Sequence, residues 1–140
     1  MDRRTFLASS TLAPVLASLG GQVHAADAAL PKVNLIYTKE NSGRWDAKKG
    51  THVPVVEVSA GKVRISTPHP MTEEHFIVRH TLLLADGTVV GAKTFKPLDM
   101  PVSEYELPVG YKGTIHATSF CNQHDFWLRG FWFFAPGKRC

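Results

Sequence analysis

Four histidines and one cysteine lie in three short segments whose spacing suits metal binding. His69 and His75 bracket a loop-like segment with a proline and a polar middle, which can bring two imidazoles to one point. Cys121 and His124 are separated by two residues, so both side chains can converge from one tight turn. His52 opens a strand-like segment, His-Val-Pro-Val. Neutral imidazole is the commonest biological metal ligand, and a thiolate is a softer, more electron-donating one.

The number of candidate ligands favours iron over zinc. A structural zinc site takes four ligands in a closed tetrahedron. Four imidazoles and one thiolate overfill that shell and suit a metal that accepts five or six ligands, so we predict one mononuclear iron per chain. The predicted ligands are His52, His69, His75, Cys121 and His124. For each histidine the alternative is an ordinary surface or packing role. For His80 and His116 we predict a second-sphere, packing or solvent-exposed role rather than metal binding.

The two cysteines of the chain leave another alternative open. In an oxidising compartment Cys121 and Cys140 could form a disulfide, which would remove Cys121 from metal chemistry. Against this pairing, Cys140 is the last residue, and chain ends are usually loose. We therefore predict that Cys121 is a metal ligand, and the state of Cys140 stays open.

Short β-rich segments must hold these residues. Seven segments rich in β-branched and aromatic residues recur about every ten residues. They are residues 54–58, 62–66, 76–85, 88–95, 103–107, 112–120 and 126–134. Asp86-Gly87 is the strongest hairpin signal and suits a two-residue type I′ turn. Because no segment after the first 25 residues shows a capped 3.6-residue apolar period, the pattern predicts an all-β fold, an antiparallel β-sandwich of about seven strands.

The first 25 residues have the features of an export signal. Arg3 and Arg4 form a twin-arginine motif, an uncharged apolar stretch follows over residues 6–21, and small residues precede Ala26. The stretch is shorter than the ~20 residues that a bilayer span needs, so it predicts a cleaved signal and no membrane part afterwards. We therefore expect a periplasmic protein. Its predicted parts are a signal peptide (1–25), an N-terminal lead-in (26–50) and an iron-binding domain (51–140).

The charge balance is only mildly basic. The chain has 16 Lys and Arg against 12 Asp and Glu, a formal net charge of +4, and these charges are scattered along it. This pattern does not favour a nucleic-acid partner. A positive surface would modestly assist the approach of a small anion.

Three segments share their residues and their order with one known family. They are His52-Val53-Pro54, the HPMTEEH stretch of residues 69–75, and Cys121-Asn122-Gln123-His124 with Trp127. These segments resemble the signatures of superoxide reductases, the iron domains of neelaredoxin and desulfoferrodoxin. The resemblance implies a seven-stranded immunoglobulin-like sandwich, four equatorial histidines, an axial cysteine and an open sixth position on the iron. It also implies reduction of superoxide to hydrogen peroxide, an external electron donor and a homo-oligomer, since members are often dimers or tetramers.

The chain departs from that family just before the first histidine. Most members have Glu-Lys there, and the lysine guides superoxide, whereas this chain has Gly50 and Thr51. Lys48 and Lys49 lie just upstream, and Lys49 is the candidate substitute for the family lysine. A position that is often tryptophan in the family is Arg79 here. The alternative function is therefore an iron-binding immunoglobulin-like module for electron transfer, redox sensing or partner binding, without efficient superoxide reduction.

Overall fold

A computed structural model of the 140-residue chain describes residues 35–133. The predicted signal peptide, the first part of the predicted lead-in and Cys140 lie outside the described residues. Within the described part of the chain, no helix is long and apolar enough to cross a membrane.

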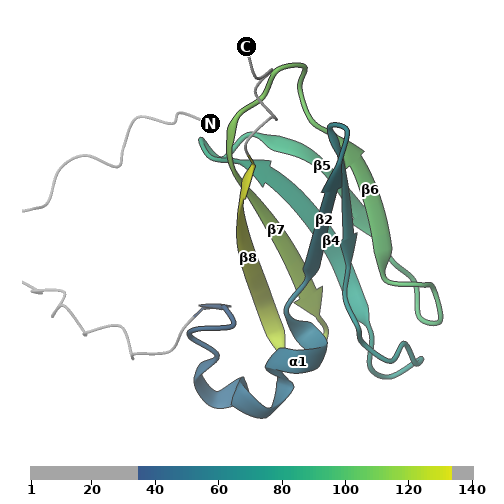
Figure 1. The fold of residues 1–140 in the computed structure, drawn as a ribbon. Coiled ribbons are helices and arrows are strands. Elements are labelled where there is room, and N and C mark those ends of the chain that lie inside the picture. The colour runs from purple at the N-terminus through teal and green to yellow at the C-terminus, as the bar shows by residue number, and fades with distance from the viewer. Residues whose placement is uncertain (1–34, 134–140) are drawn as a thin grey trace, which may run out of the picture. The chain divides into compact units, whose positions relative to one another are not determined.

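Two facing β-sheets form the sandwich that the sequence predicts (Figure 1). One sheet has the strand order β1-β8-β7-β4-β5 and consists of β1 (Ile36–Tyr37), β4 (Ile77–Leu84), β5 (Val89–Thr94), β7 (Gly113–Cys121) and β8 (Asp125–Phe133). The other has the order β2-β3-β6 and consists of β2 (Val55–Ser59), β3 (Lys62–Ser66) and β6 (Val102–Glu106). All pairs are antiparallel except β1, which runs parallel to β8. Seven of these strands match the predicted segments, and β1 is an eighth that the sequence did not predict.

The β4–β5 hairpin forms at the predicted Asp86-Gly87 pair, but with another turn. The Gly87 N–H donates to the Leu84 carbonyl at 3.0 Å, and the Leu84 N–H donates to the Thr88 carbonyl at 2.9 Å. Gly87 has a φ of +87°, whereas Asp86 is not among the residues with positive φ. This is a type I turn followed by a left-handed glycine, so the predicted type I′ turn is wrong. The Asp86 carboxylate accepts the Thr88 N–H at 2.9 Å, which stabilises the turn that forms.

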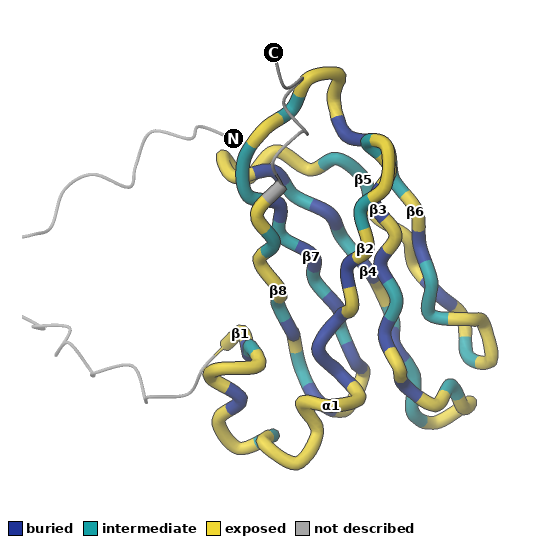
Figure 2. Tube along the Cα trace, viewed as in Figure 1, coloured by how far each residue is buried: buried dark blue, intermediate teal, exposed yellow. Residues whose placement is uncertain are grey.

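Alternating burial along β4 and β7 places their inward side chains in the core (Figure 2). The main apolar cluster between the sheets consists of Val56, Val63, Ile65, Leu82, Leu84, Leu107, Ile115 and Ala117. On β7 the same alternation continues through Ser119 to Cys121, which is 1% exposed. The strand period that builds the core therefore also points the Cys121 sulfur inward at the end of β7.

Two short helical segments precede β2 and were not predicted. They are η1 (Gly43–Lys48), a 3₁₀ segment, and α1 (Lys49–His52), a single turn that ends on His52. Each is too short for a 3.6-residue apolar period to appear in the sequence. Upstream of them, Tyr37 is buried against Val53 and Trp127. The described end of the lead-in is therefore packed on the sandwich.

Candidate metal centre

The five predicted ligands lie together at one end of the sandwich. One ligand atom from each residue lies within 4.8 Å of those of all the others. His52 comes from the end of α1, His69 and His75 come from the connection between β3 and β4, Cys121 ends β7, and His124 lies in the turn before β8. Segments that are 72 residues apart in the chain thus supply one compact group of metal-binding atoms.

Four ring nitrogens of this group face one another. The His124 Nδ1 atom is 3.0 Å from the Nε2 atoms of both His52 and His75, and the Nε2 atoms of His69 and His75 are also 3.0 Å apart. The Cys121 Sγ atom lies 3.2 Å from His75 Nε2, 3.6 Å from His124 Nδ1 and 3.9 Å from His69 Nε2. Three histidines therefore present Nε2 to the centre, and His124 presents Nδ1.

Hydrogen bonds alone cannot satisfy this group, whereas a metal ion can. His75 Nε2 faces two ring nitrogens and one sulfur, yet a ring nitrogen carries only one proton or one lone pair. Two nitrogens bound to one metal at ~2.1 Å are about 3.0 Å apart at a right angle and about 3.4 Å apart at the tetrahedral angle. The three 3.0 Å separations therefore fit right-angled ligands on a five- or six-coordinate metal such as iron, and they fit tetrahedral zinc poorly.

Burial keeps the histidines of the centre neutral. Loss of solvent, followed by repulsion from the neighbouring histidines, lowers the pKa of His52 to about 4, and the pKa of His69 is lowered to about 4 in the same way. Burial is also the main cause that lowers the pKa values of His75 and His124. All four imidazoles are therefore unprotonated at neutral pH, which is the form that binds a metal.

The turn after Cys121 directs backbone N–H groups at its sulfur. Burial raises the pKa of the Cys121 thiol, while the backbone N–H groups of Gln123 and His124 act in the opposite direction. A coordinating metal deprotonates such a thiol outright. The two N–H groups would then stabilise the thiolate that is formed.

Side chains of the Cys-Asn-Gln-His turn fix its distance from the His75 loop. The Asn122 amide accepts the Phe76 N–H at 3.0 Å and donates to the Glu74 carbonyl at 2.9 Å. The Gln123 amide donates to the same carbonyl, also at 2.9 Å. Because Glu74 and Phe76 flank His75, these bonds hold two ligand-bearing segments together. Sequence reasoning treated Asn122 and Gln123 only as spacers between ligands.

The orientation of His52 is set by its other ring nitrogen. His52 Nδ1 lies 3.0 Å from the Lys48 carbonyl and 2.8 Å from Thr51 Oγ1. Since a carbonyl only accepts, Nδ1 carries the proton and the Nε2 lone pair is directed at the other ligands. Partners of this kind raise the basicity of metal-binding histidines and fix their tautomer.

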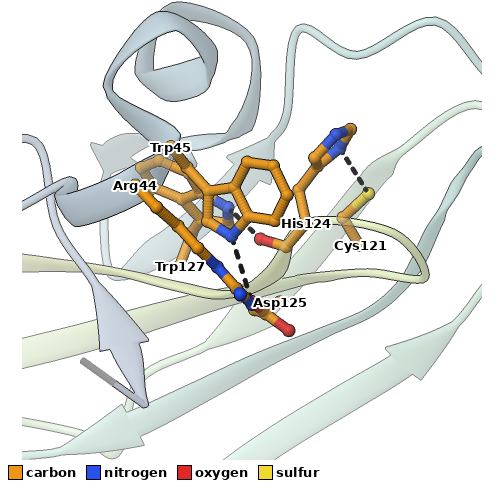
Figure 3. Close-up of polar contacts among 6 residues, drawn as sticks. All are labelled: Arg44, Trp45, Cys121, His124, Asp125 and Trp127. Carbon is orange, nitrogen blue, oxygen red and sulfur yellow. Dashed lines mark hydrogen bonds and ion pairs between the residues drawn. The ribbon is translucent and has the colours of Figure 1, made fainter. Parts of the chain in front are cut away.

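Two tryptophans and one ion pair lie around the turn that carries His124 (Figure 3). The Trp127 Nε1–H donates to the His124 carbonyl at 2.8 Å, and the Trp45 ring meets the His124 ring edge-on at 4.6 Å between centroids. Trp45 Nε1 and Arg44 both donate to the Asp125 carboxylate, at 3.0 and 2.7 Å. These contacts fasten η1 to the turn that carries His124. Sequence reasoning missed Trp45 and Asp125, because nothing in the chain pairs a residue of the lead-in with a turn 80 residues later.

The two lysines upstream of His52 differ in their surroundings. Lys49 Nζ lies 2.9 Å from the Asp46 carboxylate, so its charge is paired with an acidic side chain. Among residues 35–133, Lys48 has no carboxylate partner. Its charge instead lowers the pKa values of several groups of the centre, namely His69, His75, Cys121 and His124. The ion pair of Lys49 and these effects of Lys48 therefore favour Lys48 over Lys49 as the cation that acts on this site. The two remaining histidines of residues 35–133, His80 and His116, lie outside the ligand group.

Comparison with known proteins identifies the family. Residues 42–129 match the Desulfoferrodoxin family. Superoxide reductases of Pyrococcus abyssi and Thermococcus kodakarensis are each 36% identical to this chain over 106 residues, a match that covers 61% of this chain and 88% of theirs. The solved superoxide reductase (neelaredoxin) from Ignicoccus hospitalis superposes with a TM-score of 0.60 at 29% identity, covering 71% of this chain and 94% of the other. The superoxide reductase from Giardia intestinalis gives 0.54 at 28% identity, covering 61% and 100%.

Within residues 35–133 the β-sandwich carries at one end a His/Cys group that can hold a metal, and together with the named superoxide reductase relatives this defines an oxidoreductase with one non-haem iron. The family match spans more than half of the chain. The match to the superoxide reductase of Pyrococcus abyssi covers 88% of that relative. The chain therefore belongs to the desulfoferrodoxin family.

Proposed function

We propose that the protein reduces superoxide to hydrogen peroxide at one iron held by His52, His69, His75, Cys121 and His124. The reaction takes one superoxide anion, one electron and two protons for each hydrogen peroxide. The observation that carries the proposal is the convergence of these five ligand atoms within 4.8 Å, in a chain that is 36% identical to superoxide reductases.

The residues around the centre supply the conditions for that reaction. When bound, the iron supplies one-electron redox chemistry, and an external donor restores the electron. The Cys121 thiolate donates electron density, as thiolate ligands do in haem enzymes. Four neutral imidazoles and one thiolate add a single negative charge, so a ferrous site keeps a net positive charge that attracts an anion. The Trp45 ring packs against the His124 ring, and Trp127 holds the His124 backbone carbonyl, so both contribute to the burial of His124.

Stopped-flow mixing of the reduced, iron-loaded protein with superoxide tests the proposal. We expect rapid oxidation with one hydrogen peroxide formed per iron and no release of dioxygen. Release of dioxygen would indicate dismutation instead. A slow bleach would favour the alternative, a redox or binding module, for which Gly50 and Thr51 in place of the family Glu-Lys pair are the supporting observation.

We also propose that Lys48 provides the positive charge that guides superoxide to this site. Lys48→Met should lower the second-order rate with superoxide by about tenfold at low ionic strength, the lower end of the effect of electrostatic steering. The difference should shrink as salt screens the charge. Lys49→Met is the matched control and should leave the rate unchanged, because Lys49 is paired with Asp46. If Lys49→Met slows the reaction and Lys48→Met does not, the assignment is reversed.

We infer, finally, that the protein is exported to the periplasm through the twin-arginine route. The support is the Arg3-Arg4 pair, the short apolar stretch and the small residues before Ala26. The double variant Arg3→Lys/Arg4→Lys should accumulate uncleaved in the cytoplasm, whereas the parent should be recovered from the periplasm with a start near Ala26. Recovery of the double variant from the periplasm in processed form would exclude this route.

A further inference from the structure

A network of buried, hydrogen-bonded polar side chains runs through the core behind the metal centre. Its members are Ser103, His80, Thr67 and Ser119, with exposures of 3%, 0%, 3% and 0%. The His80 ring lies 3.0 Å from Ser103 Oγ through Nδ1 and 2.8 Å from Thr67 Oγ1 through Nε2, and Thr67 Oγ1 lies 2.9 Å from Ser119 Oγ. Ser103 is on β6, His80 on β4 and Ser119 on β7, and Thr67 follows β3, so the network joins both sheets.

One assignment of donors and acceptors satisfies every hydrogen bond of this network. The Thr67 hydroxyl donates to Ser119, so its oxygen accepts from His80 Nε2–H. His80 Nδ1 then accepts from the Ser103 hydroxyl. Both nitrogens of a neutral imidazole are used in this way. Burial lowers the pKa of His80 to about 4, so the ring keeps this neutral form at physiological pH.

Two members of the network lie two residues before predicted ligands. The Thr67 carbonyl accepts the His69 N–H at 2.7 Å, so a shift of Thr67 carries His69 with it. Ser119 shares the inward face of β7 with Cys121. The His80 ring also packs edge-on against Phe95, at 4.8 Å between centroids, and Phe95 belongs to the buried cluster that contains Cys121.

We propose that His80 is a positioning residue for the metal centre, which holds the His69 segment and the Cys121 strand at a fixed separation through Thr67 and Ser119. The inference rests on the ligand set of the proposed function. An apolar side chain could fill this inward position of β4, as Leu82 and Leu84 fill the next two. An apolar residue there could not form the hydrogen bonds that connect His80 to both ligand-bearing segments. A metal site needs its ligands held to within about 0.5 Å.

Two measurements test the inference. One is the iron affinity of the metal-free protein in competition with a chelator, and the other is the thiolate-to-ferric charge-transfer band. His80→Leu should weaken iron binding by about tenfold, the lower end of the effect of outer-shell partners, and shift the band. Thr67→Val, which removes only the hydroxyl link, should do the same. The double variant should bind iron no more weakly than the more affected single variant, because both substitutions interrupt the same hydrogen-bonded network. His80→Gln keeps a donor and an acceptor and should restore most of the affinity.

Leu82→Ala is the control for a general loss of stability, because Leu82 is fully buried on the same strand within the apolar cluster. It should lower the unfolding temperature without changing iron affinity or the band. The inference is overturned if His80→Leu and Thr67→Val bind iron within twofold of the parent with an unshifted band. It is equally overturned if Leu82→Ala changes both readouts as much as they do.

The same measurements separate this inference from the proposed function. A parent protein that shows the band but does not reduce superoxide would overturn the proposed reaction and leave the positioning role intact. A parent protein that shows no thiolate band with iron would overturn both the ligand set and the role of His80.

Discussion

Replacing Cys121 by serine should lower the rate of superoxide reduction by at least about 100-fold and abolish the thiolate-to-ferric charge-transfer band. The sulfur lies 3.2 Å from His75 Nε2 among the converging nitrogens. A serine hydroxyl occupies nearly the same volume but does not ionise to an electron-donating ligand as a thiol does. Since partners that only touch a metal ligand are worth 10–100-fold, loss of the sulfur ligand should cost at least the upper value. Stopped-flow rates and the visible spectrum of the oxidised protein measure both effects.

Cys140→Ser is the matched control for this experiment. It makes the same chemical change at the other cysteine, which lies outside the described residues. We expect it to keep both the rate and the band. Full activity in Cys121→Ser would refute the role of the sulfur. Equal loss in both variants, together with a parent mass two hydrogens below that of the reduced chain, would favour the Cys121–Cys140 disulfide.

The strands and the ligand residues could be predicted because their signals are local. Each strand carries its own β-rich run, and the ends of the predicted runs fall within a residue of the observed ones. The HPMTEEH and Cys-Asn-Gln-His segments likewise hold two ligand candidates each within seven and four residues. Type I and type I′ turns share the Asp-Gly pair, so the turn after β4 could be located but its backbone conformation could not.

The rest of the site depends on contacts between distant segments. The sequence does not show that Asp46 pairs with Lys49, which leaves Lys48 as the cation whose charge acts on the centre. It also does not show that Trp45 reaches Asp125, because that contact joins a short helical segment to a turn 80 residues away. His80 was correctly placed outside the ligand group, but its link to Thr67 and Ser119 appears only once strands of both sheets are brought together.

Removing the iron should lower the unfolding temperature of the protein by about 15 °C or more. The ligands come from segments up to 72 residues apart, so the unfolded chain cannot present them together and binds the metal far more weakly. A ligand that binds only the folded state stabilises it by about 4 kcal/mol when its free concentration is 1,000 times the Kd. For a domain of this size, each kcal/mol corresponds to about 4–8 °C. Thermal unfolding followed by circular dichroism, before and after removal of iron by a chelator, measures the difference.

The metal-free protein should remain folded, because the apolar cluster between the sheets lies apart from the ligands. Four neutral imidazoles would then stay converged without the cation that compensates for their loss of solvent. Their convergence is therefore a cost to the metal-free fold, which the bound ion offsets. The double variant His52→Ala/His124→Ala supplies the control, since it lacks two ligands and should unfold at the same temperature with and without iron. An iron-dependent gain in that variant equal to that of the parent would mean that the metal stabilises the protein from some other site.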